Sequence, residues 1–197
     1  MRGAVDDPVP GGAGRPVRLV VDGPSSSRPE QLAAAIAAEV RRLGREAVLV
    51  DARSFWRDAS LRLEFGHHDV DAFYAGWVDV PALNREVLRQ ALTGTYLPAL
   101  RDPATNRARR VPYADLPPGG VLVVFGELLL GQGLEFDLAV HLVQSASTRR
   151  RLMPPEWAWT LPAFDRYESE VSPGDLADIV VSMNDLNRPA MRWTGRE

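Results

Sequence analysis

The residues best suited to chemistry follow the first apolar run of the chain, where Gly23 begins a short polar turn. Three consecutive hydroxyls and a guanidinium stand there: Ser25, Ser26, Ser27 and Arg28. An apolar strand, a Gly/Ser turn and a helix start often form a phosphate-binding site, because free backbone N–H groups and the helix dipole favour an anion. These residues could therefore hold a phosphate. A serine-rich turn that only caps the following helix is the interpretation that we favour.

The spacing of this turn departs from the phosphate-loop pattern G-x-x-x-x-G-K-[ST]. Counted from Gly23, the second glycine, the lysine and the hydroxyl residue are replaced by Arg28, Pro29 and Glu30. Pro29 lacks a backbone N–H that such a loop would aim at a phosphate. Ser27 and Glu30 fit a capping box, in which the glutamate folds back over the helix start. Alternatively, Arg28 is the helix boundary and Pro29 the first helical residue, and in both cases we expect a compromised anion site.

Acid–base and metal chemistry have fewer candidates. Asp51 and Arg53 are two residues apart at the end of an apolar run, so on an extended strand they point to the same side. A shifted catalytic base at Asp51 is one interpretation, and we favour the other, which is a structural ion pair or a solvated strand end. His68 could act as an acid or base near neutral pH. The run His67-His68-Asp69-Val70-Asp71, with His141 at a distance, contains metal-ligand types, but adjacent side chains diverge and we predict no metal site.

Aromatic and basic clusters allow two interpretations each. Five aromatic residues could stack on a planar ligand such as a nucleobase, although such sets more often cover a core: Phe55, Trp56, Phe73, Tyr74 and Trp77. The arginines at 149–151 could meet phosphates, but a run of three is more often a solvated helix face. Trp157 and Trp159 stand among prolines. They fit either a packing plug over the sheet end or an interaction surface, and the sequence leaves both open.

Composition limits the class of protein. The 197 residues are 45% hydrophobic and 25% charged, as in folded globular chains. A net charge of −3 argues against a nucleic-acid partner, and the absence of cysteine excludes disulfides and thiolate chemistry. No apolar run is long enough to span a membrane, and the first residues lack the apolar core of a signal peptide. We expect a flexible leader at residues 1–15 and a cytoplasmic protein without nucleic-acid or membrane partners.

The elements that must position these side chains alternate between strands and helices. Short apolar runs predict five strands, at residues 17–21, 47–50, 121–125, 138–143 and 179–183. Helical spacing predicts helices at 29–43, 81–92 and 164–171. Residues 93–119 lack periodicity and are expected to form an irregular excursion with room for a small hairpin. This order predicts a mostly parallel sheet of about five strands between helical layers, with ligands beyond the strand ends near Gly23, Asp51 and Gly126.

The order of motifs resembles the uridine kinase and phosphoribulokinase family of P-loop kinases. The matching segments are 21–24 (VDGP), 54–56 (SFW), 66–74 (GHHDVDAFY), 78–83 (VDVPAL), 121–126 (VLVVFG), 136–137 (FD) and 177–181 (ADIVV), with Pro162 and Tyr167. The resemblance implies a P-loop NTPase-like three-layer α/β sandwich, formed as one domain by residues 16–197. It also implies an acceptor pocket, whose candidate residues are Arg53, Phe55, Trp56, His68, Tyr74 and Tyr167.

The departures from this family fall on the residues that would carry its chemistry. The phosphate-loop lysine and the magnesium-holding hydroxyl fall on Pro29 and Glu30, and the aspartate that accepts the substrate proton falls on Arg53. The acidic residue at the end of the third strand falls on Phe125. The arginine-bearing lid of the family, expected at residues 148–162, is shortened.

These departures predict a uridine-kinase-like protein that has lost ordinary ATP-dependent phosphoryl transfer and acts as a binding or regulatory module without a cofactor. Its partner would be a nucleoside-like small molecule or a protein. The alternative is an active, divergent kinase for a nucleoside or another small hydroxylated metabolite. That enzyme would use Ser25–Ser27 and Arg28 for phosphate and Asp51 or His68 as base, and only it would require ATP and Mg²⁺.

Overall fold

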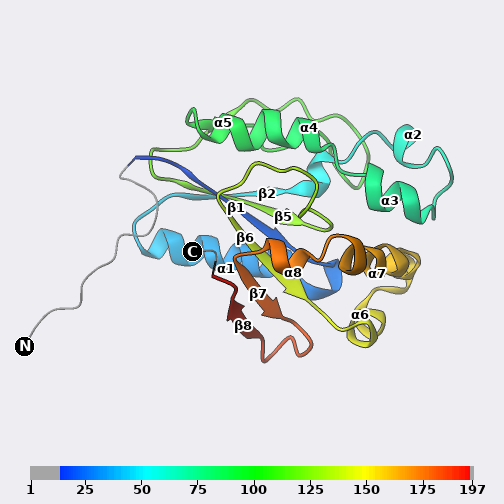
Figure 1. Cartoon of the computed structure of the whole chain (residues 1–197). Coiled ribbons are helices and arrows are strands. Elements are labelled where there is room, and N and C mark those ends of the chain that lie inside the picture. Colours follow the sequence, from blue (N-terminus) through cyan, green and yellow to red (C-terminus); the bar gives the residue numbers. More distant parts are fainter. Residues whose placement is uncertain (1–13, 196–197) are drawn as a thin grey trace, which may run out of the picture.

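Apolar runs form the strands of this protein because they are buried on both faces of a central sheet. The computed structural model describes residues 14–195 (Figure 1). Five strands run parallel in the order β2, β5, β1, β6 and β7, and a sixth, β8, pairs antiparallel with β7 at the edge. Their bounds are β1 Val17–Asp22, β2 Ala47–Asp51, β5 Val121–Gly126, β6 Leu138–Val143, β7 Ile179–Ser182 and β8 Ala190–Trp193. The five predicted strands are confirmed.

The edge strand β8 is the one that the sequence pattern does not predict. All four of its residues are exposed, with Met191 at 73% and Trp193 at 64%. A strand that is exposed on both faces carries no continuous apolar run, so periodicity gives little signal for it. The sheet therefore has six strands rather than five, and the additional strand lies at the opposite edge from β2.

Helices cover both faces of the sheet and give three layers (Figure 1). On one face lies α1, Pro29–Arg42, whose Ala33 and Ala37 are fully buried against the strands. On the other face lie α4 Val80–Leu83, α5 Arg89–Ala91, α7 Leu161–Glu170 and α8 Pro173–Leu176. A π-helical turn at Asn84–Leu88 joins α4 to α5, so the helix predicted at 81–92 is continuous but irregular. The predicted three-layer α/β architecture is confirmed.

Short elements fill the segments between these layers. Asp58 and Asp69 accept hydrogen bonds from N–H groups two and three residues on, and so begin α2 Ala59–Arg62 and α3 Val70–Gly76. The excursion at 93–119 contains a two-stranded hairpin of β3 Thr95–Tyr96 and β4 Ala114–Asp115. The region at 148–162 contains most of α6, Ala146–Leu152, and a 3-10 helix at Pro155–Thr160.

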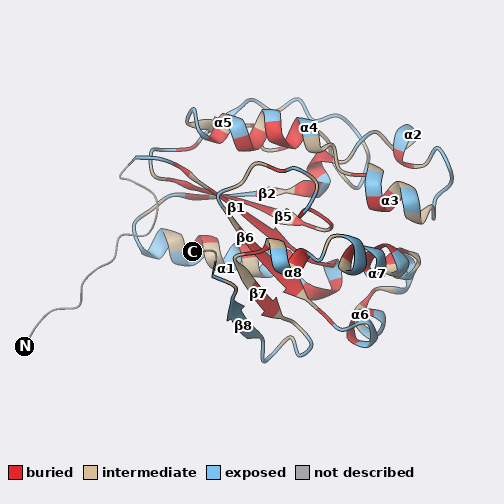
Figure 2. Ribbon diagram, in the orientation of Figure 1, coloured by how far each residue is buried: buried red, intermediate tan, exposed pale blue. Residues whose placement is uncertain are grey.

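The carboxyl ends of the central strands meet at one edge of the sheet. The strand interiors are buried (Figure 2). At the edge, the Gly23 N–H donates to the Gly126 carbonyl at 3.0 Å, and Asp51 lies in register with Phe125. The turns that follow β1, β2 and β5 are therefore neighbours, as expected for a sheet of this topology.

The amino-terminal segment is described only in part. Of the leader predicted at residues 1–15, only Gly14 and Arg15 lie within the described residues, and the Arg15 guanidinium lies 3.1 Å from Asp137. Arg18 on β1 donates to the same carboxylate at 2.8 Å, which ties the start of β1 to the start of β6. Between residues 14 and 195, no helix has the length and apolar character needed to cross a membrane.

Candidate functional site

The hydrogen-bonding groups of the serine turn after β1 are satisfied largely by partners within the protein. It forms a 3-10 helix, Ser25–Ser27, in which the Ser27 N–H donates to the Pro24 carbonyl at 2.8 Å and the Arg28 N–H donates to the Ser25 carbonyl at 3.0 Å. The Ser27 hydroxyl also donates to the Pro24 carbonyl at 2.6 Å. Ser26 is buried, and its hydroxyl donates to a glutamine side chain at 2.7 Å. Most of the donors of this turn therefore face inward rather than toward an incoming anion.

The boundary of α1 decides between the two alternatives that the sequence left open. Arg28 is the N-cap of α1, in the left-handed region at φ 59°, and Pro29 is the first helical residue. Within the described chain, no side chain forms a cap hydrogen bond at this helix start, so the predicted capping box of Ser27 and Glu30 is wrong. Proline suits the first helical position because its fixed φ matches the helix and no N–H partner is needed there.

A carboxylate of the protein itself is hydrogen-bonded to the serine turn. Glu127, directly after β5, accepts a hydrogen bond from the Ser25 N–H at 2.5 Å. Burial raises the pKa of the Glu127 carboxyl, against the opposing influence of the Ser25 N–H and the Arg53 guanidinium. Sequence reasoning looked for a third-strand carboxylate at Phe125 and overlooked Glu127 two residues later. The Gly-Glu pair that ends this strand was the available signal.

A strained turn holds the backbone that carries Glu127. The next residue, Leu128, has φ 58°, a conformation in which the β carbon crowds the backbone. The two N–H groups that follow hold the turn: one donates to Asp22 Oδ1 at 2.9 Å and the other to the Tyr167 hydroxyl at 2.8 Å. The Tyr167 hydroxyl donates in turn to Asp22 Oδ2 at 3.0 Å. The direction of Glu127 thus depends on side chains from β1 and α7.

The buried Asp22 carboxylate is balanced by a histidine on β6. His141 Nδ1 lies 2.8 Å from Asp22 Oδ2, and the two side chains are 2% and 0% exposed. Glu168 Oε1 lies 3.6 Å from His141 Nε2, which is too long for a hydrogen bond but still attractive. Burial opposes the imidazolium charge, but the two carboxylates outweigh it and raise the pKa of His141 to about 9. His141 is therefore the charged partner of Asp22 at neutral pH.

The histidines and acids of the sequence do not assemble a metal centre in the part of the chain that is described. Across residues 14–195, no three His, Cys, Asp or Glu side chains gather closely enough to hold an ion. His68 is exposed, and its ring lies 5.3 Å from the Trp159 ring. It takes no part in the ion pair of His141 with Asp22.

Asp51 and Arg53 form the ion pair that we favoured from the sequence. The Arg53 guanidinium donates to both carboxylate oxygens of Asp51 at 2.8–3.1 Å, and the Arg53 backbone N–H adds a bond of 2.9 Å. Hydrogen bonding to Asp51 raises the pKa of Arg53. A carboxylate that is paired in this way has little capacity left to accept a substrate proton.

Aromatic rings fill the space between β2 and the lid region. Trp157 and Trp159 lie 6.2 Å apart, roughly stacked, and both pack on Trp77, at 6.0 and 5.8 Å. Trp56 and Phe73 meet Trp77 edge to face at 5.0 and 5.1 Å. Of the two alternatives for the lid tryptophans, the structure shows the packing plug.

The arginine run of the lid region divides between the interior and solvent. Arg149 is 2% exposed, and its guanidinium donates to the Asp165 carboxylate and the Gln144 carbonyl. Arg150 and Arg151 are exposed, as expected for a solvated helix face. Arg149 therefore serves the packing of α6 on α7, and two of the three arginines face solvent.

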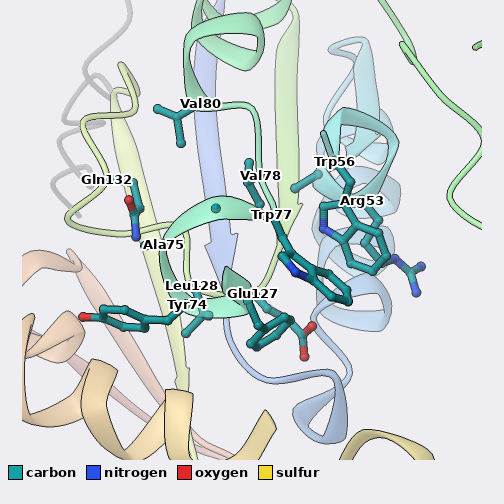
Figure 3. A pocket seen from close by; sticks show the side chains of 13 residues that line it. Arg53, Trp56, Tyr74, Ala75, Trp77, Val78, Val80, Glu127, Leu128 and Gln132 are labelled. Atoms are coloured by element: carbon teal, nitrogen blue, oxygen red, sulfur yellow. The ribbon is translucent and has the colours of Figure 1, made fainter. Parts of the chain in front are cut away.

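A small hollow remains between the aromatic rings and Glu127 (Figure 3). It brings together three of the predicted acceptor-pocket residues, Arg53, Trp56 and Tyr74, beside Trp77 and Glu127. Its volume of about 30 Å³ is enough for water but far below the roughly 300 Å³ of a small-molecule site. Two further candidates, Phe55 and Tyr167, are 0% and 2% exposed and belong to the core.

A second, larger hollow opens beside Trp56, between α2 and the excursion. Its volume is about 440 Å³, within the range of small-molecule sites. Its lining is half apolar and half charged: Trp56, Leu61, Leu100 and Ala108, with Arg57, Asp58, Asp79 and Arg101. Asp58 and Arg101 pair with each other at 2.9 Å. The Arg57 guanidinium has no ion-pair partner among residues 14–195 and remains available at the rim.

The residues at the serine turn do not fit magnesium and ATP, the cofactors that the fold implies. All 23 basic residues of the chain are arginine, so no lysine replaces the one that is missing at Pro29. The hydroxyl position carries Glu30, and the Ser25 N–H is already bonded to Glu127. A triphosphate would meet two carboxylates where it needs donors and cations.

Comparison with known structures supports the fold. A possible uridine kinase from Bacillus stearothermophilus matches with a TM-score of 0.68 and 22% identity, over 85% of this chain and 89% of that chain. A proposed fructose transport system kinase from Silicibacter sp. TM1040 matches with a TM-score of 0.55 and 20% identity, over 79% and 82%. The YGR205w protein gives 0.56 and 11%, over 92% and 91%. No protein-family model and no curated protein matches the sequence. The chain therefore has the P-loop kinase-like α/β fold that its motif order predicts.

Proposed function

We propose that this protein is a binding or regulatory module with a kinase-like fold that has lost ATP-dependent phosphoryl transfer. One observation carries the proposal: the Ser25 N–H is bonded to the Glu127 carboxylate, so an anion of the protein lies where this fold would receive a phosphate. The Arg53 guanidinium beside Glu127 is engaged by Asp51 and offers little free positive charge.

The charges at the serine turn oppose phosphoryl transfer. That reaction depends on positive charge around the transferred group, and each missing group would cost several kcal/mol of transition-state stabilisation. Pro29 and Glu30 remove the lysine and the metal-holding hydroxyl. Glu127 adds a further carboxylate, because it lines another small hollow, beside the serine turn, together with Ser25, Pro29 and Glu30. The exposed guanidinium of Arg28 is a weak replacement for these groups.

The acceptor side, meaning the larger hollow beside Trp56, supports binding of a small hydroxylated molecule. The Trp56 ring offers a stacking surface, while Asp79 and Arg57 offer a carboxylate and a guanidinium that could bond hydroxyls. The names of two structures that share the fold, a possible uridine kinase and a proposed fructose transport system kinase, both contain the name of a polyhydroxylated compound. A nucleoside is therefore the first ligand to test.

Binding and turnover are tested separately. Calorimetry should show no micromolar binding of magnesium-ATP, and a panel of nucleosides and sugars with ATP should show no phosphate transfer. The same panel without ATP should contain a ligand that raises Tm. Arg57→Ala and Asp79→Asn should each weaken that ligand about tenfold, because each removes one charged hydrogen bond. Asparagine can still accept the bond from the Ala82 N–H that begins α4.

Arg110→Ala is the matched control, since Arg110 is exposed on the same excursion but does not line the hollow. Turnover of any panel member that disappears in Arg28→Ala or Asp51→Ala would establish the active, divergent kinase instead. A ligand whose affinity is unchanged by both acceptor-side variants would contradict the proposed location. If no panel member raises Tm, the small-molecule part of the proposal fails and a protein partner becomes the better explanation.

A further inference from the structure

We infer that the edge strand β8 is a self-association site, at which a second copy of this chain adds its own β8 antiparallel and extends the sheet across a two-fold axis. β8, Ala190–Trp193, is the last strand of the six-stranded sheet, and no strand among residues 14–195 pairs with its outer edge (Figure 1). The inference goes beyond the proposed function, because ligand binding on the acceptor side requires no second copy.

The outer edge of β8 presents backbone groups that no strand of the described chain pairs. The Thr194 N–H, directly after the strand, donates inward to the Asp178 carbonyl at 3.0 Å. The N–H and C=O groups of successive residues in a strand point to opposite edges, so Arg192 also faces β7. Met191 and Trp193 therefore direct their N–H and C=O groups outward, where a further strand can pair with them.

The side chains of the same two residues are apolar and exposed. Met191 is opposite Val181 on β7, and each shares the sheet face of the other. Trp193 is opposite Ile179 in the same way. Val181 and Ile179 pack in the apolar layer between the sheet and α1, and Met191 and Trp193 continue that layer to the edge. Figure 2 shows that β8 is exposed there, so the layer extends beyond the elements that cover it.

The strand lacks most of the features that keep an exposed edge from pairing. Natural edge strands are protected by proline, lysine, inward-pointing charges or a bulge. β8 contains no proline, and Arg192 is its one charged residue. Pro189 stands before the strand and leaves the outward N–H groups of Met191 and Trp193 in place.

The order of residues makes this edge complementary to itself. An antiparallel pair centred on Arg192 puts Met191 of each copy opposite Trp193 of the other, and each of these pairs exchanges two backbone hydrogen bonds. Each pair also brings a thioether against an indole ring, which is a favourable contact. A second copy supplies this arrangement by symmetry, and this favours it over an unrelated partner.

The central pair of Arg192 side chains limits the strength of the dimer. Like charges directly opposite each other are destabilising, and salt screens their repulsion, so the dimer should tighten as the ionic strength rises. A strand of 4 residues also buries less than the roughly 800 Å² per partner of a standard interface. We therefore expect a dissociation constant on the order of 100 µM, so that the chain is monomeric at low micromolar concentration.

Sedimentation equilibrium of the full-length chain, from about 10 µM to about 1 mM, measures the association. Trp193→Lys puts a charge on the edge and should raise the dissociation constant roughly tenfold or more. Met191→Pro removes an outward N–H but no bond to β7, and it should act in the same direction if the lysine variant does not fold. Arg192→Ala removes the repulsion, so it should lower the dissociation constant about threefold and flatten its salt dependence.

An engineered cysteine tests the register, because the chain has none of its own. Arg192 and its symmetry copy would form a non-hydrogen-bonded pair with Cα atoms about 4.5 Å apart, a separation that suits a disulfide. Oxidised glutathione should therefore convert Arg192→Cys into a covalent dimer much faster than Phe65→Cys. Phe65 is the matched position, since it is 75% exposed between α2 and α3.

Phe65→Ala is the control for general apolar association and should leave the dissociation constant unchanged. A chain that stays monomeric at about 1 mM would overturn the inference. Equal association by the wild type and Trp193→Lys, or equal disulfide rates at positions 192 and 65, would do the same. A mass that grows beyond the dimer would also contradict it, because a closed two-fold pair leaves no β8 edge open. No ligand is present, so this test can fail while the proposed function stands, and kinase turnover would refute only the latter.

Discussion

The two sides of the strand ends use their polar groups in opposite ways. We call the serine turn together with Glu127 the donor side. Its carboxylate and N–H group are paired with each other inside the protein. The ion pair of Asp22 with His141 beneath them is buried, with side chains that are 0% and 2% exposed. On the acceptor side, Arg57 lines a hollow of about 440 Å³, and its guanidinium has no ion-pair partner among residues 14–195. The contrast shows that one sheet can carry both a set of polar groups that are paired inside the protein and a hollow whose charged groups face solvent.

Breaking the network beneath the donor side should have the largest effect. Asp22→Ala would leave the His141 imidazolium, the Tyr167 hydroxyl and a turn N–H without their acceptor. We expect the free energy of unfolding to fall by about 3–5 kcal/mol, the usual result of removing one partner from a buried ion pair. Urea denaturation measures this loss.

The matched substitution on the acceptor side is Arg101→Ala, which breaks the half-exposed ion pair with Asp58. It should cost less than about 1 kcal/mol, because solvent screens that pair. Similar losses of unfolding free energy for Asp22→Ala and Arg101→Ala would contradict the distinction between a buried network on the donor side and a solvent-exposed one on the acceptor side.

Raising the pH should weaken the same network. The pKa of His141 is about 9 in the folded protein and 6.5 in its ordinary state, so folding stabilises the protonated ring. That stabilisation is complete below pH 6.5 and is lost as the pH rises through 9. A shift of this size corresponds to about 3 kcal/mol, shared among His141, Asp22 and Glu168. Urea denaturation across this range should show the loss in the wild type and a flatter profile in His141→Asn, and parallel profiles would exclude the linkage.

The strands and helices could be predicted from the sequence because they follow local patterns. The pairing of polar groups on the donor side could not. The strands and α1 follow from apolar spacing over a few consecutive residues. The contact of Glu127 with Ser25 joins residues 102 positions apart and depends on the left-handed Leu128, so no local pattern reports it. The capping box at Glu30 does not form because Pro29 is the first helical residue. The sequence offered this helix start as one of two alternatives but did not decide between them.

Opening the aromatic plug should have an intermediate effect. Trp157 is half-buried against Trp56 and Trp77 at 6.3 and 6.0 Å. Trp157→Ala should lower the free energy of unfolding by about 2 kcal/mol, less than for a fully buried tryptophan, and hydrogen exchange should quicken over residues 155–160. Trp193→Ala is the control: Trp193 is 64% exposed on β8, so its change should stay within about 0.5 kcal/mol. Equal effects would mean that the ring contacts of Trp157 add no more stability than an exposed tryptophan does.

The smallest expected effect isolates the backbone of the serine turn from its charges. Arg28 has φ 59°, a conformation in which its β carbon crowds the backbone. Glycine would remove this crowding, but it would also make the unfolded chain more flexible, which partly offsets the gain in stability. Arg28→Gly should therefore raise the free energy of unfolding by roughly 0.5 kcal/mol and Tm by one or two degrees. Arg150→Gly, the same substitution within α6, should instead lower it by about 1 kcal/mol. If Arg28→Gly lowers stability as well, the Arg28 side chain must contribute contacts at the donor side that outweigh the relief of crowding.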